Sequence, residues 1–412
     1  MDIKEKALDL LLTNIKEGYS NHFKRRYFYC APDEMHYHQW FWDSCFHMIV
    51  MSEFRPDLAI KEFRSLLSCQ TEDGFIPHII FWKWRPLDIF QYLQSWRKEV
   101  HPVYKYFTAE IQPPVIGISL RRIYEKTRSI KLLEKYLPRV QKYFDYLRDK
   151  RDLDKNLLIS VITPMESGMD MAPQFDIAMG VNDHDHIVVK GKIAEMLSAY
   201  RRVGWNIDRI FDLDIFNFED VAVNTIYALS LEDLAYLWRL IDKKEAKRVR
   251  QLYEQVKEKI VEKYWDDDDK IFYGRFHKHK KEYRVKIKTV SSLFPLCLDI
   301  DKKYVNALVK HIVDPKEFWM KYMVPSVARD EKSFGPLTDT RFIWRGTTWI
   351  NTNWFLCKGL LRHGKKKLYQ QIKAKTFELI EKHGFCEYYD PTTGEPGDAM
   401  RNFGWSTLAA DM

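Results

Sequence analysis

The feature that most constrains this chain is a long succession of segments with helical periodicity and no linker between them. In residues 243–263, apolar side chains recur every three or four positions, which places them on one face of a helix. Similar patterns cover residues 42–69, 115–127, 138–150, 187–203, 230–241, 303–312, 348–363 and 366–383. A fixed sequence period would indicate an open solenoid, and none is present. We therefore predict one all-α domain over residues 1–412, an (α/α)6 toroid of six helical hairpins.

Three local features refine this prediction. Residues 1–18 form an amphipathic pattern without an apolar core segment or a small-residue cleavage site, so we expect a helix and not a signal peptide. Pro138 is typical of a first helical position. Residues 271–276 and 283–288 carry strand signals and predict a small β-hairpin arm joined by a charged loop.

Charge and cysteine usage exclude several classes of protein. The net charge of +8 is spread over short Lys runs that lack interleaved aromatics, which favours a solvated surface over nucleic-acid binding. No uninterrupted apolar stretch is long enough to span a membrane. The 6 Cys form no CxxC and no metal-ligand spacing, which indicates a reduced, cytoplasmic compartment. We expect neither a metal nor a cofactor, and interpret the acidic run 266–269 as a solvated turn because it lacks the pattern of an EF-hand. The oligomeric state is left open.

Glycine is scarce, and much of it lies in loops rich in aromatic and acidic residues. Only 16 Gly occur, while aromatic residues make up 15% of the chain. In a toroid the inner helices converge at one end, where loops surround a central pocket. Tryptophan and tyrosine suit a sugar site, because a pyranose packs flat on an aromatic ring, although they also fill large cores.

The segment Trp40-Phe-Trp-Asp43 places a carboxylate directly after two tryptophans at an expected helix start. Asp43 is either the N-cap of that helix or an acceptor for sugar hydroxyls, with Trp40 or Trp42 as a stacking wall.

Two further loops carry acids that suit proton transfer. Glu166, Asp170 and Asp176 crowd one turn, and in a dry pocket one of them keeps its proton as a general acid must. A turn capped by its own acids is the alternative. Glu387 follows the helix stop at Gly384 and precedes two tyrosines, whose hydroxyls we expect to hold it ionised as a base. Hydrolysis of a glycosidic bond needs such a pair of carboxyl groups, but composition alone does not choose the pair.

Seven segments in a fixed order resemble glycoside hydrolase family 63, in particular its short mannosylglycerate and glucosylglycerate hydrolases. These segments are Gln39 to His47, Asp73-Gly-Phe-Ile-Pro77, Gln112-Pro-Pro114, Glu166-Ser-Gly-Met-Asp170, Trp344-Arg-Gly-Thr-Thr-Trp349, Glu387-Tyr-Tyr and Phe403-Gly-Trp-Ser406. The resemblance implies an (α/α)6 fold and an inverting α-glycosidase acting on a small carbohydrate, with Asp170 as general acid and Glu387 as general base. In an inverting enzyme the two carboxyl groups stand about 6.5–9.5 Å apart.

The resemblance also implies which residues surround the substrate. Those implied for the sugar are Trp40, Trp42, Asp43, Gln112, Trp344 and Trp349, and Asn402 is implied near the glycerate. The departures from the family pattern, such as Met171 and Ala172 after the acid and Thr347 in place of a proline, lie toward the leaving group. A glycerate carboxylate requires a cationic fork, for which Arg345, Arg401, Arg85 and Lys83 are the alternatives.

Three other functions compete with this interpretation. One is hydrolysis of a short α-gluco-oligosaccharide or disaccharide. Another is sugar epimerisation on a related toroid, with His184 and His186 as proton-transfer groups and His36, His38 and His78 as further histidines. The third is carbohydrate binding without catalysis, which the presence of both carboxylates disfavours.

Overall fold

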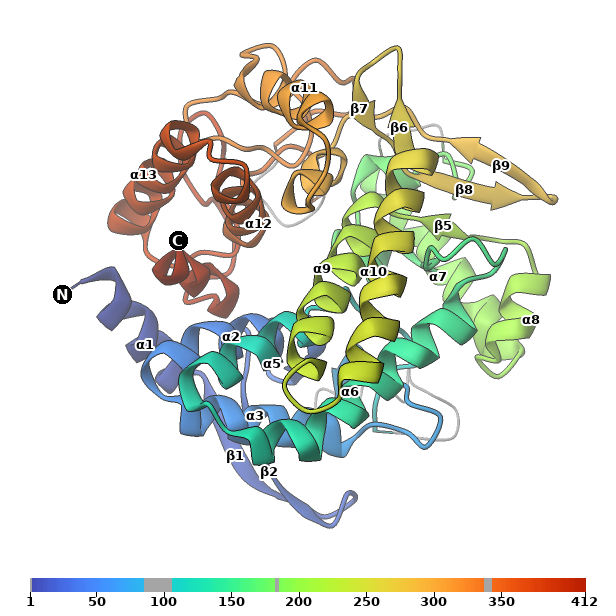
Figure 1. Ribbon diagram of the computed structural model, residues 1–412. Coiled ribbons are helices and arrows are strands. Elements are labelled where there is room, and N and C mark those ends of the chain that lie inside the picture. Colours follow the sequence, from blue (N-terminus) through green and yellow to red (C-terminus); the bar gives the residue numbers. More distant parts are fainter. Residues whose placement is uncertain (1, 85–105, 182–184, 337–342) are drawn as a thin grey trace.

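The centre of the molecule is a closed ring of six helical elements, around which the other helices are arranged (Figure 1). The computed structural model describes residues 2–84, 106–181, 185–336 and 343–412. In ring order the inner elements are α2 (Phe41–Phe54), α5 (Ile116–Thr127), α9 (Val221–Trp238), η3 (Val290–Cys297), α12 (Ile350–Arg362) and η4 (Gly404–Asp411). Each packs against the next, and η4 packs back against α2. Because η3 and η4 are 3-10 helices, the inner ring is not α-helical throughout.

Each inner element is covered by an outer helix. The outer helices are α3 (Pro56–Ser68), α6 (Ile130–Arg151), α10 (Lys243–Tyr264), α11 (Lys302–Val313), α13 (Lys366–His383) and α1 (Ile3–Thr13). The first and last helical elements of the chain, α1 and η4, form the sixth pair and close the ring. The predicted six-hairpin toroid is confirmed, with a closing hairpin whose two halves come from opposite ends of the chain.

Burial distinguishes the inner elements from the outer ones. Every residue from Phe41 to Ser52 of α2 is buried, whereas α10 buries one stripe and exposes its charged face. Gly117 lies in contact with α9, where a Cβ atom would stand 2.8 Å from the Ser230 carbonyl oxygen. Gly359 of α12 is equally close to the backbone of Leu296 in η3. The inner elements therefore approach one another closely enough to leave little space at these crossings.

Several elements lie outside the double ring. The helices are α7 (His186–Arg202) and α8 (Ile207–Asp212), with two short 3-10 turns, η1 (Pro164–Ser167) and η2 (Pro173–Phe175). Antiparallel pairs join β1 (Ile15–Ser20) to β2 (Arg25–Cys30), β3 (Gln39–Trp40) to β4 (Ile79–Ile80), and β6 (Trp265–Asp266) to β7 (Ile271–Phe272). A fourth sheet joins the three strands β5 (Phe218–Glu219), β8 (Arg275–Lys278) and β9 (Lys281–Arg284).

The structure corrects four of the expected elements. The N-terminal helix ends at Thr13, and the chain turns there into the unpredicted β1–β2 hairpin. Pro138 lies inside α6 and not at its start. The helix expected over 42–69 is divided between α2 and α3, because Pro56 occupies a first-turn position and begins a new helix. The helix expected from 230 already begins at Val221, since the Asp220 side chain caps it by accepting a hydrogen bond from the Val223 N–H at 2.9 Å.

The predicted β-hairpin arm is present in shorter form as β8 and β9, which pair on either side of His279 and Lys280. Residues 271–272 pair with β6 instead. Among the described residues, no helix combines the length and the apolar character needed to cross a membrane.

Candidate active site

The residues selected from sequence gather where the inner elements begin. Trp40 is the N-cap of α2 and Trp349 is the N-cap of α12. Gln112 precedes α5, and its side-chain oxygen accepts a hydrogen bond from the Trp42 N–H at 2.9 Å. The site therefore lies at the N-terminal ends of the inner helices, where backbone N–H groups and helix dipoles favour negative charge.

A continuous set of tryptophans connects three of these elements. The Trp344 and Trp349 rings are stacked, with centroids 3.6 Å apart. Trp349 meets Trp405 of η4 edge-on at 5.7 Å, and Trp405 meets Trp42 of α2 edge-on at 5.6 Å. Trp405 was not among the predicted site residues, although it lies in the Phe403-Gly-Trp-Ser406 segment. Its indole N–H donates to the Glu387 carbonyl oxygen at 3.1 Å, so the aromatic cluster is attached to the segment that carries the expected base.

The three acids of the loop between α6 and α7 have different surroundings. Glu166 is fully buried and forms a double ion pair with Arg151, with both N–O distances 2.7 Å. Asp176 forms a similar pair with Arg345, again with both distances 2.7 Å. Asp170 has no cation at ion-pair distance among the residues that the structure describes. Of the three carboxyl groups, Asp170 is therefore the one left available for proton transfer.

Glu166 fixes this loop to its neighbours. Besides the Arg151 pair, its carboxylate accepts hydrogen bonds from the backbone N–H groups of Ile111 at 2.9 Å and Ile162 at 2.8 Å. The first holds the segment before Gln112, and the second holds the segment before Asp170. Glu166 thus joins two of the loops that line the site.

We expect Glu166→Gln to lower the free energy of unfolding by about 3–5 kcal/mol, because it leaves the buried Arg151 cation without its counter-ion. Denaturant unfolding followed by circular dichroism measures this. Glu195→Gln, which alters an exposed i,i+3 pair with Lys192, serves as the control and should change stability by less than about 1 kcal/mol. Equal stability of the two variants would contradict the structural role of Glu166.

Asp170 is partly exposed and carries a raised pKa. Burial raises the pKa of its carboxyl to about 7, an effect that its own backbone N–H and the His36 cation partly offset. A substantial fraction of Asp170 is therefore protonated at neutral pH, as a general acid requires.

Glu387 is 8% exposed and is held by its own backbone, whose N–H donates to the Met400 carbonyl at 2.8 Å. Burial raises the pKa of Glu387 to about 7, the His36 cation lowers it, and the negative charge of Asp170 raises it further. The charge of Asp170 therefore acts on the ionisation of Glu387.

The expected support of Glu387 by tyrosine is wrong for Tyr389. Its hydroxyl donates to the Gly384 carbonyl at 2.6 Å and accepts from the Cys386 N–H at 2.8 Å, so it braces the turn before Glu387. The group that favours the ionised form of Glu387 is the cation of His36.

Asp43 lies in the first turn of α2 and is 2% exposed. It is not the N-cap, because Trp40 holds that position. Burial raises its pKa to about 8, and the charge of Glu387 contributes to the increase. Among the described residues, the Asp43 Oδ1 atom and the Trp40 indole N–H are buried without hydrogen-bond partners. Buried polar atoms are normally paired, so one acceptor and one donor are available here for a polar ligand such as a sugar.

The pair Asp33–His36 was missed as part of this site. The Asp33 carboxylate accepts from the backbone N–H of His36 and pairs with its ring Nδ1, both at 2.7 Å. Burial lowers the pKa of His36, but this hydrogen bond and the surrounding carboxylates raise it to about 9. The histidine is consequently cationic at neutral pH and stabilises negative charge on Asp43, Asp170 and Glu387. The Asp-x-x-His spacing was visible in the sequence, but only the fold places it beside these acids.

The other expected ligands are either paired within the protein or exposed. Both terminal nitrogens of Arg345 are engaged by Asp176 in a buried ion pair, so this arginine is not a free fork for a carboxylate. Asn402 is exposed, and its carbonyl accepts from Asn14 at 3.0 Å. Arg401 is also exposed and donates to the Gly397 carbonyl at 3.3 Å. Lys83 is exposed as well, whereas Arg85 and His184 lie outside the described residues.

His186 is the first residue of α7 and directly follows the N-cap residue Asp185. The Asp185 side chain accepts a hydrogen bond from the Ile187 N–H. It is not among the groups that set the pKa values of Asp170 and Glu387.

Comparison with known proteins agrees with the fold. The family model described as the mannosylglycerate hydrolase MGH1-like glycoside hydrolase domain matches residues 36–406. A mannosylglycerate hydrolase of Thermus thermophilus is 28% identical over 405 residues, covering 90% of this chain and 93% of that protein. A glucosylglycerate hydrolase of Mycolicibacterium hassiacum is 24% identical over 420 residues, covering 90% of each.

Solved structures are similar over the whole chain. A crystal structure of a family 63 mannosylglycerate hydrolase from Thermus thermophilus, in complex with Tris and D-glycerate, has a TM-score of 0.84 at 24% identity. The similarity covers 99% of both chains. The fold is also shared, at a TM-score of 0.57, by a neutral trehalase from Saccharomyces cerevisiae.

Proposed function

This chain belongs to the family of mannosylglycerate hydrolase MGH1-like glycoside hydrolases, and on that premise we propose that it hydrolyses mannosylglycerate or glucosylglycerate. In this proposal Asp170 is the general acid and Glu387 is the general base. One observation carries the assignment. Asp170 is the acid of its loop without an ion pair among the described residues, and its charge contributes to the raised pKa of Glu387.

Each carboxyl group has one task in this mechanism. Protonated Asp170 donates its proton to the glycosidic oxygen as the C1–O bond breaks. Ionised Glu387 takes a proton from a water molecule, and the oxygen of that water bonds to C1 from the opposite face. The products are glycerate and a free sugar whose anomeric configuration is inverted. The proton that Glu387 gains and the one that Asp170 loses are exchanged with solvent before the next turnover.

The remaining residues orient the sugar in this proposal. Trp40 is partly exposed and supplies aromatic surface, whereas Trp42, Trp344 and Trp349 are buried and support the site from within. The Asp43 carboxyl and the Trp40 indole N–H supply an acceptor and a donor for hydroxyl groups. The Gln112 side chain positions Trp42 by accepting a hydrogen bond from the Trp42 backbone N–H. His36 acts on the two carboxyl groups through its charge.

The substrate is tested with mannosylglycerate, glucosylglycerate, trehalose, kojibiose, nigerose and maltose, with the first product anomer read by NMR. We expect hydrolysis of at least one glycerate and release of the β-anomer. Hydrolysis of disaccharides alone would contradict the glycerate assignment, whereas release of the α-anomer would contradict the role of Glu387.

We expect kcat/KM to have a bell-shaped pH profile with its maximum near pH 7. Below the pKa of about 7, Glu387 is protonated and no longer accepts a proton, and above the pKa of about 7, Asp170 is ionised and no longer donates one. Because the two groups interact, the two limbs report the pair and not the separate residues. Replacement of His36 by Gln removes a cation that lowers both pKa values, so both limbs should move to higher pH. An unchanged profile in this variant would contradict the influence of His36.

We further propose that the chain acts as a single domain in the cytoplasm on a small carbohydrate, without nucleic acid or membrane as partners. All six cysteines are free and buried, which is typical of a reducing compartment.

A further inference from the structure

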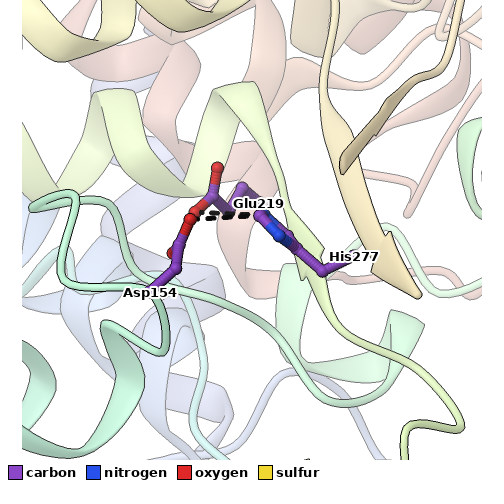
Figure 2. Close-up of side chains that lie close together, drawn as sticks. All are labelled: Asp154, Glu219 and His277. Atoms are coloured by element: carbon purple, nitrogen blue, oxygen red, sulfur yellow. Dashed lines mark ion pairs between the residues drawn. The ribbon is translucent and has the colours of Figure 1, made fainter. Parts of the chain in front are cut away.

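Three potential metal ligands converge outside the catalytic pair. Asp154 comes from the loop after α6, Glu219 ends β5, and His277 lies on β8 (Figure 2). One ligand atom from each lies within 4.8 Å of the others. The three residues are far apart in the sequence, so no metal-ligand motif in the sequence predicts this cluster.

The distances suit a metal ion more closely than a direct hydrogen bond. The His277 Nε2 atom lies 3.8 Å from Asp154 Oδ2 and 3.6 Å from Glu219 Oε1. Donor atoms at about 2.1 Å from a tetrahedral ion stand roughly 3.4 Å from one another. The His277 nitrogen is therefore within a few tenths of an ångström of this separation from each carboxylate oxygen, and the two carboxylate oxygens, which lie within 4.8 Å of each other, would move together on binding one ion.

Two buried atoms of this cluster lack partners among the described residues. Glu219 is 0% exposed, yet its Oε2 atom accepts no hydrogen bond. The His277 Nε2 atom, which faces both carboxylates in Figure 2, is also buried without a hydrogen bond. The oxygen of Glu219 that faces His277 is Oε1, so the unpaired Oε2 reflects the cost of burying this carboxylate, and a cation bound at Oε1 would compensate its charge.

Asn156 holds the two carboxylates in place. Its side-chain amide donates to Glu219 Oε1 at 2.7 Å and to Asp154 Oδ2 at 3.0 Å, the two oxygens that face His277. Such outer contacts orient metal ligands in proteins. The Asp154 side chain is 33% exposed, which gives an ion access from solvent.

We propose that Asp154, Glu219 and His277 bind one divalent first-row transition ion, Zn²⁺ or Mn²⁺. One imidazole nitrogen with two carboxylate oxygens suits such ions, whereas Ca²⁺ requires six to eight oxygen ligands. Water completes the coordination on the exposed side of Asp154.

The ion would support the loop that carries Asp170 and would take no part in the chemistry. Phe218, next to Glu219, pairs through its backbone with Val161, which leads into that loop. Asp220, on the other side of Glu219, accepts a hydrogen bond from Gln174 of the same loop at 3.3 Å. The ion would therefore link the hairpin arm to the supports of the catalytic loop.

Isothermal titration of chelator-treated full-length protein with ZnCl₂ and, separately, MnCl₂ at about pH 8 tests this proposal, with CaCl₂ for comparison. We expect one equivalent of Zn²⁺ or Mn²⁺ and a rise in Tm of about 2–5 °C with that ion in excess. His277→Gln and Asp154→Asn should each weaken binding at least about tenfold and remove most of the rise in Tm. His279→Gln, two positions along the same hairpin and 79% exposed, is the matched control and should bind as wild type does.

Two results would overturn the proposal. One is the absence of binding to wild-type protein up to about millimolar metal; the other is equal affinity in wild type, His277→Gln and Asp154→Asn. Circular dichroism verifies that the two variants are folded, and Asp154, being partly exposed, tolerates amide replacement best. Failure of this test leaves the glycosidase assignment untouched, since the ion has no role in the reaction.

Discussion

Replacement of Asp170 by Asn is expected to reduce kcat for the glycerate substrate by about 10²–10⁴-fold, the usual contribution of a general acid. This corresponds to about 3–5 kcal/mol of transition-state stabilisation. The amide cannot donate a proton of comparable acidity to the departing glycerate oxygen. The carboxyl it replaces has no ion pair among the described residues, so the fold should tolerate the change.

The loss should depend on the leaving group. An α-glycosyl fluoride departs as fluoride ion and needs little protonation, so Asp170→Asn should retain most of the wild-type rate on it. Steady-state kinetics with the glycerate and the fluoride measure this ratio, and Glu195→Gln is the exposed control. An equal loss on both substrates would contradict the role of general acid and indicate a defect in folding or sugar binding.

The sequence predicts the helices well because periodicity is a local property. It predicts α10 and α13 almost to their ends, since their apolar stripes and their stops are continuous in the chain. It fails for Pro138, because tertiary packing holds α6 as one helix through that residue. It also fails to reveal that η4 pairs with α1, because this contact joins the two ends of the chain.

The chemistry of the site could be predicted only in part for the same reason. Residue types and order are sufficient to select Asp170 and Glu387 as a hypothesis. The state of each acid, however, depends on partners that are distant in sequence. Arg345 is a plausible carboxylate fork until the fold pairs it with Asp176, and His36 is one of many histidines until it lies beside Glu387.

These distant partners also explain how similar acids acquire different roles. Glu166 and Asp170 are four residues apart, but Arg151 neutralises the first and no described cation pairs with the second. Desolvation, which the His36 cation offsets only in part, raises the pKa of Asp170 and Glu387 toward neutrality, where a group can donate or accept a proton. The fold thus separates structural from reactive carboxylates by its placement of arginines.

Replacement of Glu387 by Gln is expected to reduce kcat by a similar factor of about 10²–10⁴, but on both kinds of substrate. Attack by water needs a base whichever group departs, so the fluoride should be hydrolysed as poorly as the glycerate. The acid limb of the pH profile, which reports protonation of Glu387, should also disappear. This pattern distinguishes the base from the acid without reference to the size of the loss.

Shortening the same side chain to Ala makes the test stricter. The smaller residue leaves space for azide, which needs no base and would attack C1 from the side where Glu387 directs water. We expect azide to restore turnover in Glu387→Ala and to yield the β-glycosyl azide, with the glycerate oxygen still protonated by Asp170. NMR of the product identifies the anomer. An α-glycosyl azide would place the nucleophile on the other face of the sugar and would reverse the assignment of Glu387 as the base of an inverting enzyme.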